Sequence, residues 1–287
     1  MTVKTMKATR LSVPPRVAHT ELHRAIVDLD GECDRFDILA SSLDFVTPLE
    51  LCGLRALLDH ASRRARVVHF DHPVNPNAHN YLTRMDFFRD LPENVELSGP
   101  VPQLRRNPLR ESLIELCRIT TIEGVEALPE RVWQIARPHF GSGPIAKACG
   151  TAIAAATENV LNHAESPIGA LVAAQRYKRT GIELAVVDLG VGIPTTLRRN
   201  PDYAELTDLD ALEAALRDKV SATGKEGRGA GLWELLTTAS RAGNATLTIQ
   251  SGHAHHTVSC SKGGTTTYQS RPACPVPGTW IALQLQP

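Results

Sequence analysis

The residues of this chain whose types and spacing could do chemistry together begin with a carboxylate and a carboxamide, Glu158 and Asn162. They are four positions apart, so a helix places them on one face, one turn apart. The carboxylate can accept a proton from water or a hydroxyl, and the amide oxygen is a hard ligand that suits Mg²⁺. His163 follows directly and could contact a phosphate. A solvent-exposed helix end is the alternative interpretation.

A second set of residues follows an apolar run, residues 184–187, that is typical of a buried strand. Asp188 stands at the end of this strand, and Gly190 and Gly192 alternate after it. An aspartate shielded by apolar neighbours can accept a hydrogen bond from the exocyclic amine of adenine, and it would reject guanine. The glycines let the backbone turn sharply and let a flat ligand approach. A plain strand-to-loop turn is the alternative interpretation.

A third set consists of three alternating glycines, Gly227, Gly229 and Gly231, that lead into an apolar helix. Backbone N–H groups at a glycine-rich helix start bind phosphate, aided by the helix dipole. The alternating spacing differs from a Rossmann fingerprint, and the sequence contains no Walker A motif. Lys225 and Arg228 could neutralise the charge of a γ-phosphate. For each of these two residues, a solvated surface loop is the alternative interpretation.

In their order and spacing, the three sets resemble the N, G1 and G2 boxes of the GHKL ATPase/kinase superfamily. The resemblance covers residues 109–287 and implies ATP with Mg²⁺ as cofactors and a mobile lid over residues 194–226. It implies that Glu158 is the general base, that Asn162 holds Mg²⁺, and that Asp188 lies at adenine with Gly192. The remaining residues that the resemblance places around the nucleotide are Asn159, His163, Gly190, Ile193, Lys225, Gly227, Arg228, Gly229, Ala230, Gly231 and Leu232.

The elements that must position these residues form an α+β arrangement. Strands are expected at 113–119 and 182–188, and helices at 129–138, 144–162 and 208–220. From residue 244 the chain reads as successive strands with turns at Ser251-Gly252, Gly263-Gly264 and Pro277-Gly278. Helices first and an antiparallel meander afterwards predict a mixed, mostly antiparallel sheet with helices on one face. The resemblance identifies this fold as a Bergerat-type sandwich.

The first third of the chain predicts a small α/β domain at residues 21–92, after an extended lead-in at 1–20. Strands at 35–40 and 66–70 alternate with helices at 49–65 and 81–88. Residues 44–54 and 81–88 resemble STAS domains, but Thr47-Pro48-Leu49 stands where an Asp-Ser pair would be phosphorylated. A packing or partner-docking role is therefore expected. Breakers from Pro92 to Pro108 mark a linker at 93–108.

Composition and charge exclude several classes of function. Of 287 residues, 42% are hydrophobic and 22% are charged, and the formal net charge is zero. This balance gives no global electrostatic case for binding nucleic acid or an anionic membrane. We expect a cytoplasmic protein without a membrane partner, because an apolar run of about 20 residues and a signal core are both missing. The six cysteines are expected to be buried thiols, and the His-rich run at 253–256 is expected to be a hairpin loop rather than a metal site.

The expected function is that of a regulatory Mg-ATP-binding protein that acts on a partner protein. Histidine kinases need a dimerisation helix, and gyrase-type enzymes need a transducer domain; neither is recognisable in the sequence. The compact anti-sigma-factor serine/threonine kinases are the better match, which implies a STAS-type or sigma-factor-type partner. A homodimer is compatible with this expectation. The alternatives are a non-catalytic ATP sensor and a scaffold in which the STAS-like domain captures a partner.

Overall fold

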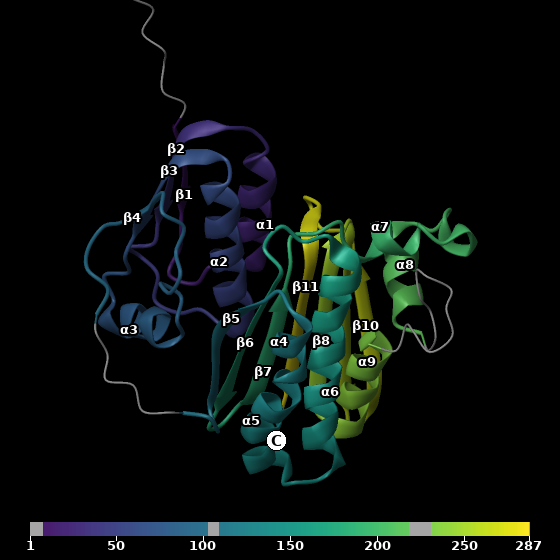
Figure 1. Ribbon diagram of the computed structural model, residues 1–287. Helices are drawn as coiled ribbons and strands as arrows, with labels where there is room; N and C mark the ends of the chain where they lie inside the picture. The colour runs from purple at the N-terminus through teal and green to yellow at the C-terminus, as the bar shows by residue number, and fades with distance from the viewer. Residues whose placement is uncertain (1–7, 103–108, 218–230, 287) are drawn as a thin grey trace, which may run out of the picture.

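The computed structural model describes residues 8–102, 109–217 and 231–286. The chain is a mixed α/β structure with two sheets, one of four parallel strands and one of seven antiparallel strands (Figure 1). Helices lie between the two sheets and on the far side of the larger sheet (Figure 1). In the part of the chain that is described, no helix is long and apolar enough to cross a membrane.

The smaller sheet has the strand order β1-β2-β3-β4. Each parallel step needs a crossover connection, and a helix lies in each of the three connections. The elements are β1 (Ala8–Ser12), α1 (His19–Asp28), β2 (Cys33–Leu39), α2 (Pro48–Ser62), β3 (Ala65–Asp71), α3 (Pro76–Arg84) and β4 (Val95–Leu97).

Two strands of this sheet lie in segments expected to be irregular. Strand β1 and the first residues of α1 fall within the expected lead-in at 1–20, and β4 falls within the expected linker at 93–108. Both strands pair with an inner strand, β1 with β2 and β4 with β3. Edge strands of five and three residues carry little hydrophobic periodicity of their own, so the pairing partner decides their conformation.

Helix α2 forms where its sequence signals place it. Thr47 is the N-cap, Pro48 occupies the first turn, and Glu50 returns a carboxylate to the Thr47 backbone N–H at 3.1 Å. The expected helix at 49–65 is confirmed, although it ends at Ser62. Most of its residues are buried all round the helix, as they must be for a helix enclosed between two sheets.

The larger sheet has the strand order β10-β9-β8-β11-β7-β6-β5. Its strands are β5 (Leu113–Ile119), β6 (Ala170–Tyr177), β7 (Gly181–Val187), β8 (Ala245–Gly252), β9 (Ala254–Ser261), β10 (Gly264–Ser270) and β11 (Val276–Leu285). The strand expected at 113–119 is confirmed. The strand expected at 182–188 is confirmed with its end at Val187. Strand β6 had not been expected.

Two expectations for the C-terminal strands are wrong. Pro277 and Gly278 do not form a turn between strands; they lie inside β11, where the pairing with β8 shifts register between Val276 and Thr279. His255 and His256 are not loop residues either, because they belong to β9 and pair with β8. The turns at Ser251-Gly252 and Gly263-Gly264 are confirmed, since β8 ends at Gly252 and β10 begins at Gly264.

The remaining helices lie in the same part of the chain as the strands of the larger sheet. They are α4 (Ile122–Glu126), α5 (Leu128–Phe140), α6 (Pro144–Asn159), the π-helical turn η1 (Val160–Ala164), α7 (Ile193–Leu197), the 3₁₀ turn η2 (Pro201–Tyr203), α8 (Asp208–Ala215) and α9 (Gly231–Ala242). Helices α5, α6 and α9 cover one face of the sheet (Figure 1). The helices expected at 129–138 and 144–162 are thus confirmed with shifted ends. The helix expected at 208–220 is confirmed for Asp208–Ala215, and residues 218–220 lie outside the described residues.

The other face of the larger sheet is covered by helices of the N-terminal region, whose packing there the sequence had not predicted. Helix α2 packs on β6 and β7, and α1 packs on β11 (Figure 1). At the centre of this contact, a Cβ added to Gly53 of α2 would lie 2.2 Å from the indole of Trp280, which is fully buried in β11. Strand β7 is buried at every position for the same reason.

Candidate functional site

The first motif lies where α6 changes its helical form. Helix α6 ends at Asn159 and continues as the π-helical turn η1, which holds Asn162 and His163. Such π-helical turns are rare in proteins, and those that do occur are often found at functional sites. Glu158 and Asn162 are both exposed, and the Asn162 amide donates to the Glu158 carboxylate at 3.3 Å. The expectation that these two side chains share one face is confirmed.

The second motif contains a deeply buried carboxyl group. Asp188, directly after β7, is 1% exposed, and its Oδ1 accepts a hydrogen bond from the Gly190 N–H at 2.6 Å. Burial raises the pKa of this carboxyl group to about 7, against the opposing effect of hydrogen bonds from Gly190 and Thr279. The group therefore exchanges a proton near neutral pH, and it can accept or donate a hydrogen bond there.

The glycines of the second motif allow close backbone contacts. A Cβ on Gly190 would lie 2.0 Å from the carbonyl oxygen of Ala164, and Gly192, at φ +81°, lies against the hydroxyl of Ser251. The Val191 N–H donates to the Ala164 carbonyl at 2.8 Å. Ala164 ends the turn that holds Asn162, so the structure brings the first and second motifs together.

Ile193 connects the second motif to the segment expected to act as a lid. Its N–H donates to the Ser251 hydroxyl at 2.9 Å, and it begins α7. Helix α8 is tied to the sheet through Asp208, which pairs with Arg198 and accepts from the His253 N–H at 2.6 Å. Within the described part of the expected lid, residues 194–217, the start of α8 is therefore held against the β8–β9 turn.

Most of the third motif falls outside the described residues. This applies to Lys225, Gly227, Arg228, Gly229 and Ala230. Gly231 and Leu232 are the first residues of α9. The expectation that a helix follows the alternating glycines is confirmed, while the placement of the glycines relative to Asp188 stays a prediction.

Two residues that the sequence did not single out complete the surroundings of Asp188. Ser251, in β8, donates its hydroxyl to the Gly278 carbonyl at 2.7 Å, and the Thr279 hydroxyl bonds the Asp188 carboxyl group. Gly278 has a φ of +71°, and a Cβ at this position would lie only 2.2 Å from the Asp188 carbonyl oxygen. The sequence signals at these positions were the expected turns at Ser251-Gly252 and Pro277-Gly278, and the second is a bulge rather than a turn.

The side chains of the first motif, a carboxylate and an amide, carry oxygen atoms of the kind that Mg²⁺ binds. Among the described residues, no group of three or more His, Cys, Asp or Glu side chains is placed to hold a metal ion. Glu158 and Asn162 are exposed and adjacent, and the Asn162 amide nitrogen donates to the Glu158 carboxylate. Mg²⁺ commonly binds few protein oxygens and takes the rest from phosphate and water.

Comparisons with known proteins add no family to these observations: no protein-family model matches the chain, and no curated protein does.

Proposed function

We propose that this chain is a regulatory Mg-ATP-binding protein of the GHKL type, with a Bergerat-type sandwich and a STAS-like unit on its second face. The observation that carries the proposal is the position of Asp188. This buried carboxyl group ends a central strand and is one short glycine turn away from the helix end that carries Glu158 and Asn162. A buried hydrogen-bonding group next to glycines suits a flat base, and exposed oxygen ligands suit Mg²⁺ and phosphates.

Each residue has a stated role in this proposal. The Asp188 carboxyl group accepts the exocyclic amine of adenine, and Gly190 and Gly192 leave room for the base. Asn162 holds Mg²⁺ through its amide oxygen, and Glu158 accepts the proton of the attacking hydroxyl or water. Bound Mg-ATP supplies the phosphoryl group to be transferred. The acceptor is a serine or threonine of a partner protein, of the STAS or sigma-factor type, or water.

Nucleotide-dependent thermal stability tests the binding step. Mg-ATP should raise the melting temperature of the full chain and Mg-GTP should not, because a ligand that binds only the folded state stabilises it. Asp188→Asn should weaken ATP binding about tenfold, through one lost hydrogen bond to a charged or strongly polarised group. The matched control is Asp202→Asn, at an exposed carboxylate near η2. A wild-type protein that does not respond to Mg-ATP would refute the proposal.

Phosphoryl transfer from γ-labelled ATP separates catalysis from sensing. Glu158→Ala should abolish release of labelled phosphate or labelling of a partner while ATP still stabilises the protein. Glu126→Ala, at an exposed glutamate of α4, should leave both measurements unchanged. If wild type binds ATP and Glu158→Ala changes no chemical product, the protein is the non-catalytic sensor. If no nucleotide binds but a partner is captured, it is the scaffold.

A further inference from the structure

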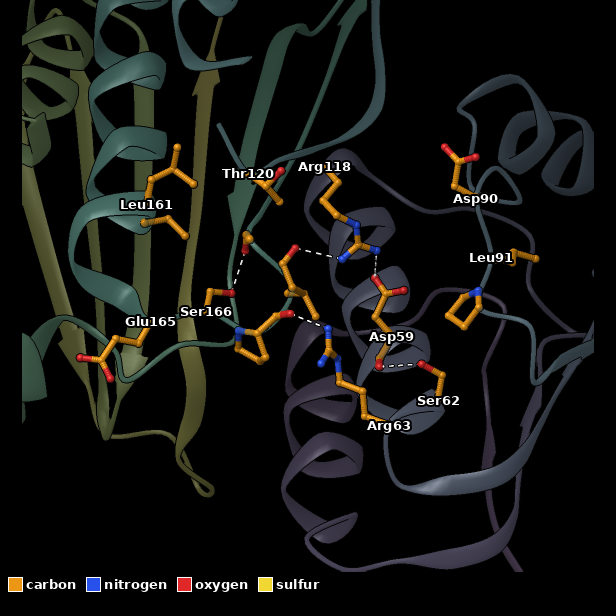
Figure 2. A pocket seen from close by; sticks show the side chains of 15 residues that line it. Asp59, Ser62, Arg63, Asp90, Leu91, Arg118, Thr120, Leu161, Glu165 and Ser166 are labelled. Atoms are coloured by element: carbon orange, nitrogen blue, oxygen red, sulfur yellow. Dashed lines mark hydrogen bonds and ion pairs between the residues drawn. The ribbon is translucent and has the colours of Figure 1, made fainter. Parts of the chain in front are cut away.

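A cavity lies between the part of the chain that forms the smaller sheet and the part that forms the larger one (Figure 2). It has a volume of about 640 Å³, within the range of ligand pockets. One wall comes from the end of α2 and residues 90–92, and the other from η1 and the loop 165–169. The cavity is therefore lined both by residues of the part that forms the smaller sheet and by residues of the part that forms the larger sheet.

Two arginines, one from each part, converge on neighbouring carbonyl groups in this cavity (Figure 2). Arg63, at the end of α2, donates Nη2 to the Pro167 carbonyl at 2.5 Å. Arg118, in β5, donates Nη1 to the Ile168 carbonyl at 2.9 Å and Nη2 to the Asp59 carboxylate at 2.6 Å. Within the described part of the chain, Nε and Nη1 of Arg63 and Nε of Arg118 have no hydrogen-bond partner.

Positive charge exceeds negative charge at the floor of the cavity. The Asp59 side chain is 4% exposed, and it already pairs with Arg55 at 3.2 Å as well as with Arg118. Arg55 also donates to the carbonyls of residues 87, 89 and 90. Arg55 and Arg118 thus share the Asp59 carboxylate, and among the described residues Arg63 has a carbonyl but no carboxylate as its partner.

The two other acidic residues that line the cavity do not balance this excess. Glu165 pairs with Arg199 at 2.6 Å and points away from the two central arginines (Figure 2). Asp90 lies near Arg89 at 3.6 Å, and its side chain is 90% exposed. Both carboxylates are exposed, so water screens their charges, as it does that of the exposed Arg63. Only Asp59 and Arg55 are fully buried, and Arg118 is 33% exposed.

We propose that this cavity is a binding site for a small oxyanion, the phosphate or carboxylate group of a metabolite-sized ligand, and that Arg63 and Arg118 hold it. Guanidinium donors bind such groups in a forked, charge-assisted geometry. The rim hydroxyls of Ser62 and Thr120 provide further polar contacts. This proposal does not depend on the nucleotide site, because the residues that carry it are different.

Titration of the full chain with inorganic phosphate and, separately, with citrate tests the proposal at constant ionic strength. Wild type should bind at least one of the two anions saturably by calorimetry, and the tighter one identifies phosphate or carboxylate as the preferred group. Arg63→Gln should weaken binding about tenfold, since it removes a charge-assisted contact. Arg66→Gln is the matched control, because that side chain is 84% exposed and lies outside the cavity.

Two further variants keep the outcome clear. Thr120→Glu keeps both arginines and adds a carboxylate at the rim, so it should abolish anion binding by repulsion. Asp188→Asn should leave anion binding unchanged. The proposal is overturned if wild type binds neither anion, if Arg63→Gln binds like Arg66→Gln, or if Asp188→Asn removes the binding and thereby assigns it to the nucleotide site.

Discussion

The two faces of the seven-stranded sheet are both buried, but they are buried in different ways. The face under α5, α6 and α9 has an almost entirely aliphatic core, in which Thr157 satisfies its hydroxyl within its own helix. The face under α1 and α2 is also largely apolar, yet it encloses His23, Glu183 and the Arg55–Asp59 pair. The first face thus resembles the interior of one domain, and the second resembles an interface between two.

The polar groups of the second face specify one arrangement of the two parts. Glu183, in β7, receives hydrogen bonds from Thr47 and Leu49 at the start of α2, while burial raises the pKa of its carboxyl group. Tyr81 donates its hydroxyl to Gln175 at 2.7 Å across the same interface. A shift of α2 and α3 together along the sheet would leave these groups buried without partners, which costs more than losing apolar contact alone. Of the three predictions that follow, from the largest expected effect to the smallest, the second and third test this difference.

Asp188→Asn should change stability most, and in a pH-dependent way. The pKa of Asp188 is raised from 3.8 to about 7 in the folded protein. Its contribution to stability is therefore complete below about pH 4 and is lost as the pH rises through 7. The uncharged variant should be more stable than wild type at pH 8 by roughly 2–4 kcal/mol, at about 1.4 kcal/mol per pKa unit, and the gain should vanish near pH 4.

Urea unfolding of the nucleotide-free protein at pH 4, 6 and 8 measures this effect. Asp202→Asn should show no comparable pH dependence, because that side chain is exposed. An equal stability difference at all three pH values would contradict the assignment of a raised pKa to Asp188.

Gly53→Ala and Gly150→Ala compare the two faces directly. Both glycines lie in helices; a Cβ would meet the Trp280 ring at 2.2 Å from Gly53, and the Pro129 carbonyl oxygen at 2.6 Å from Gly150. Each substitution should cost about 2–3 kcal/mol through overpacking. Only Gly53→Ala should loosen the contact between α2 and the larger sheet. This variant should therefore no longer unfold in a single cooperative transition.

Urea unfolding followed by far-UV circular dichroism and by tryptophan fluorescence tests the comparison. The two probes should give separate transitions for Gly53→Ala and coincident ones for Gly150→Ala. Gly31→Ala serves as the control, because a Cβ there meets nothing within 4 Å. Coincident transitions for Gly53→Ala would mean that the second face is as cooperative as the first.

Tyr81→Phe should have the smallest effect. It removes the hydroxyl that bonds Gln175 across the second face and leaves the aromatic ring in place. The expected loss is about 1 kcal/mol, the usual net value of one hydrogen bond, measured by urea unfolding at pH 7. Tyr203→Phe, in η2, is the matched control. An equal loss of unfolding free energy in both variants would contradict a specific contribution of the Tyr81–Gln175 hydrogen bond.

The sequence by itself determined the elements whose signals are local. Pro48 and Glu50 place the start of α2, the apolar alternation places β5, and the i, i+4 spacing places Glu158 beside Asn162. It also placed Asp188 directly after a buried strand. Each of these depends on residues within about one turn or one strand of each other, and such patterns are readable without a partner.

Only the tertiary structure decided which segments meet. The pairing of β1 and β4, the bulge in β11, and the closure of Asp188 by Thr279 all depend on contacts between residues distant in the sequence. The same holds for α2 on the second face and for Arg63 beside Arg118. A side chain's type says what it can bind, but its burial and its neighbours, which set its pKa and its free donors, come from packing.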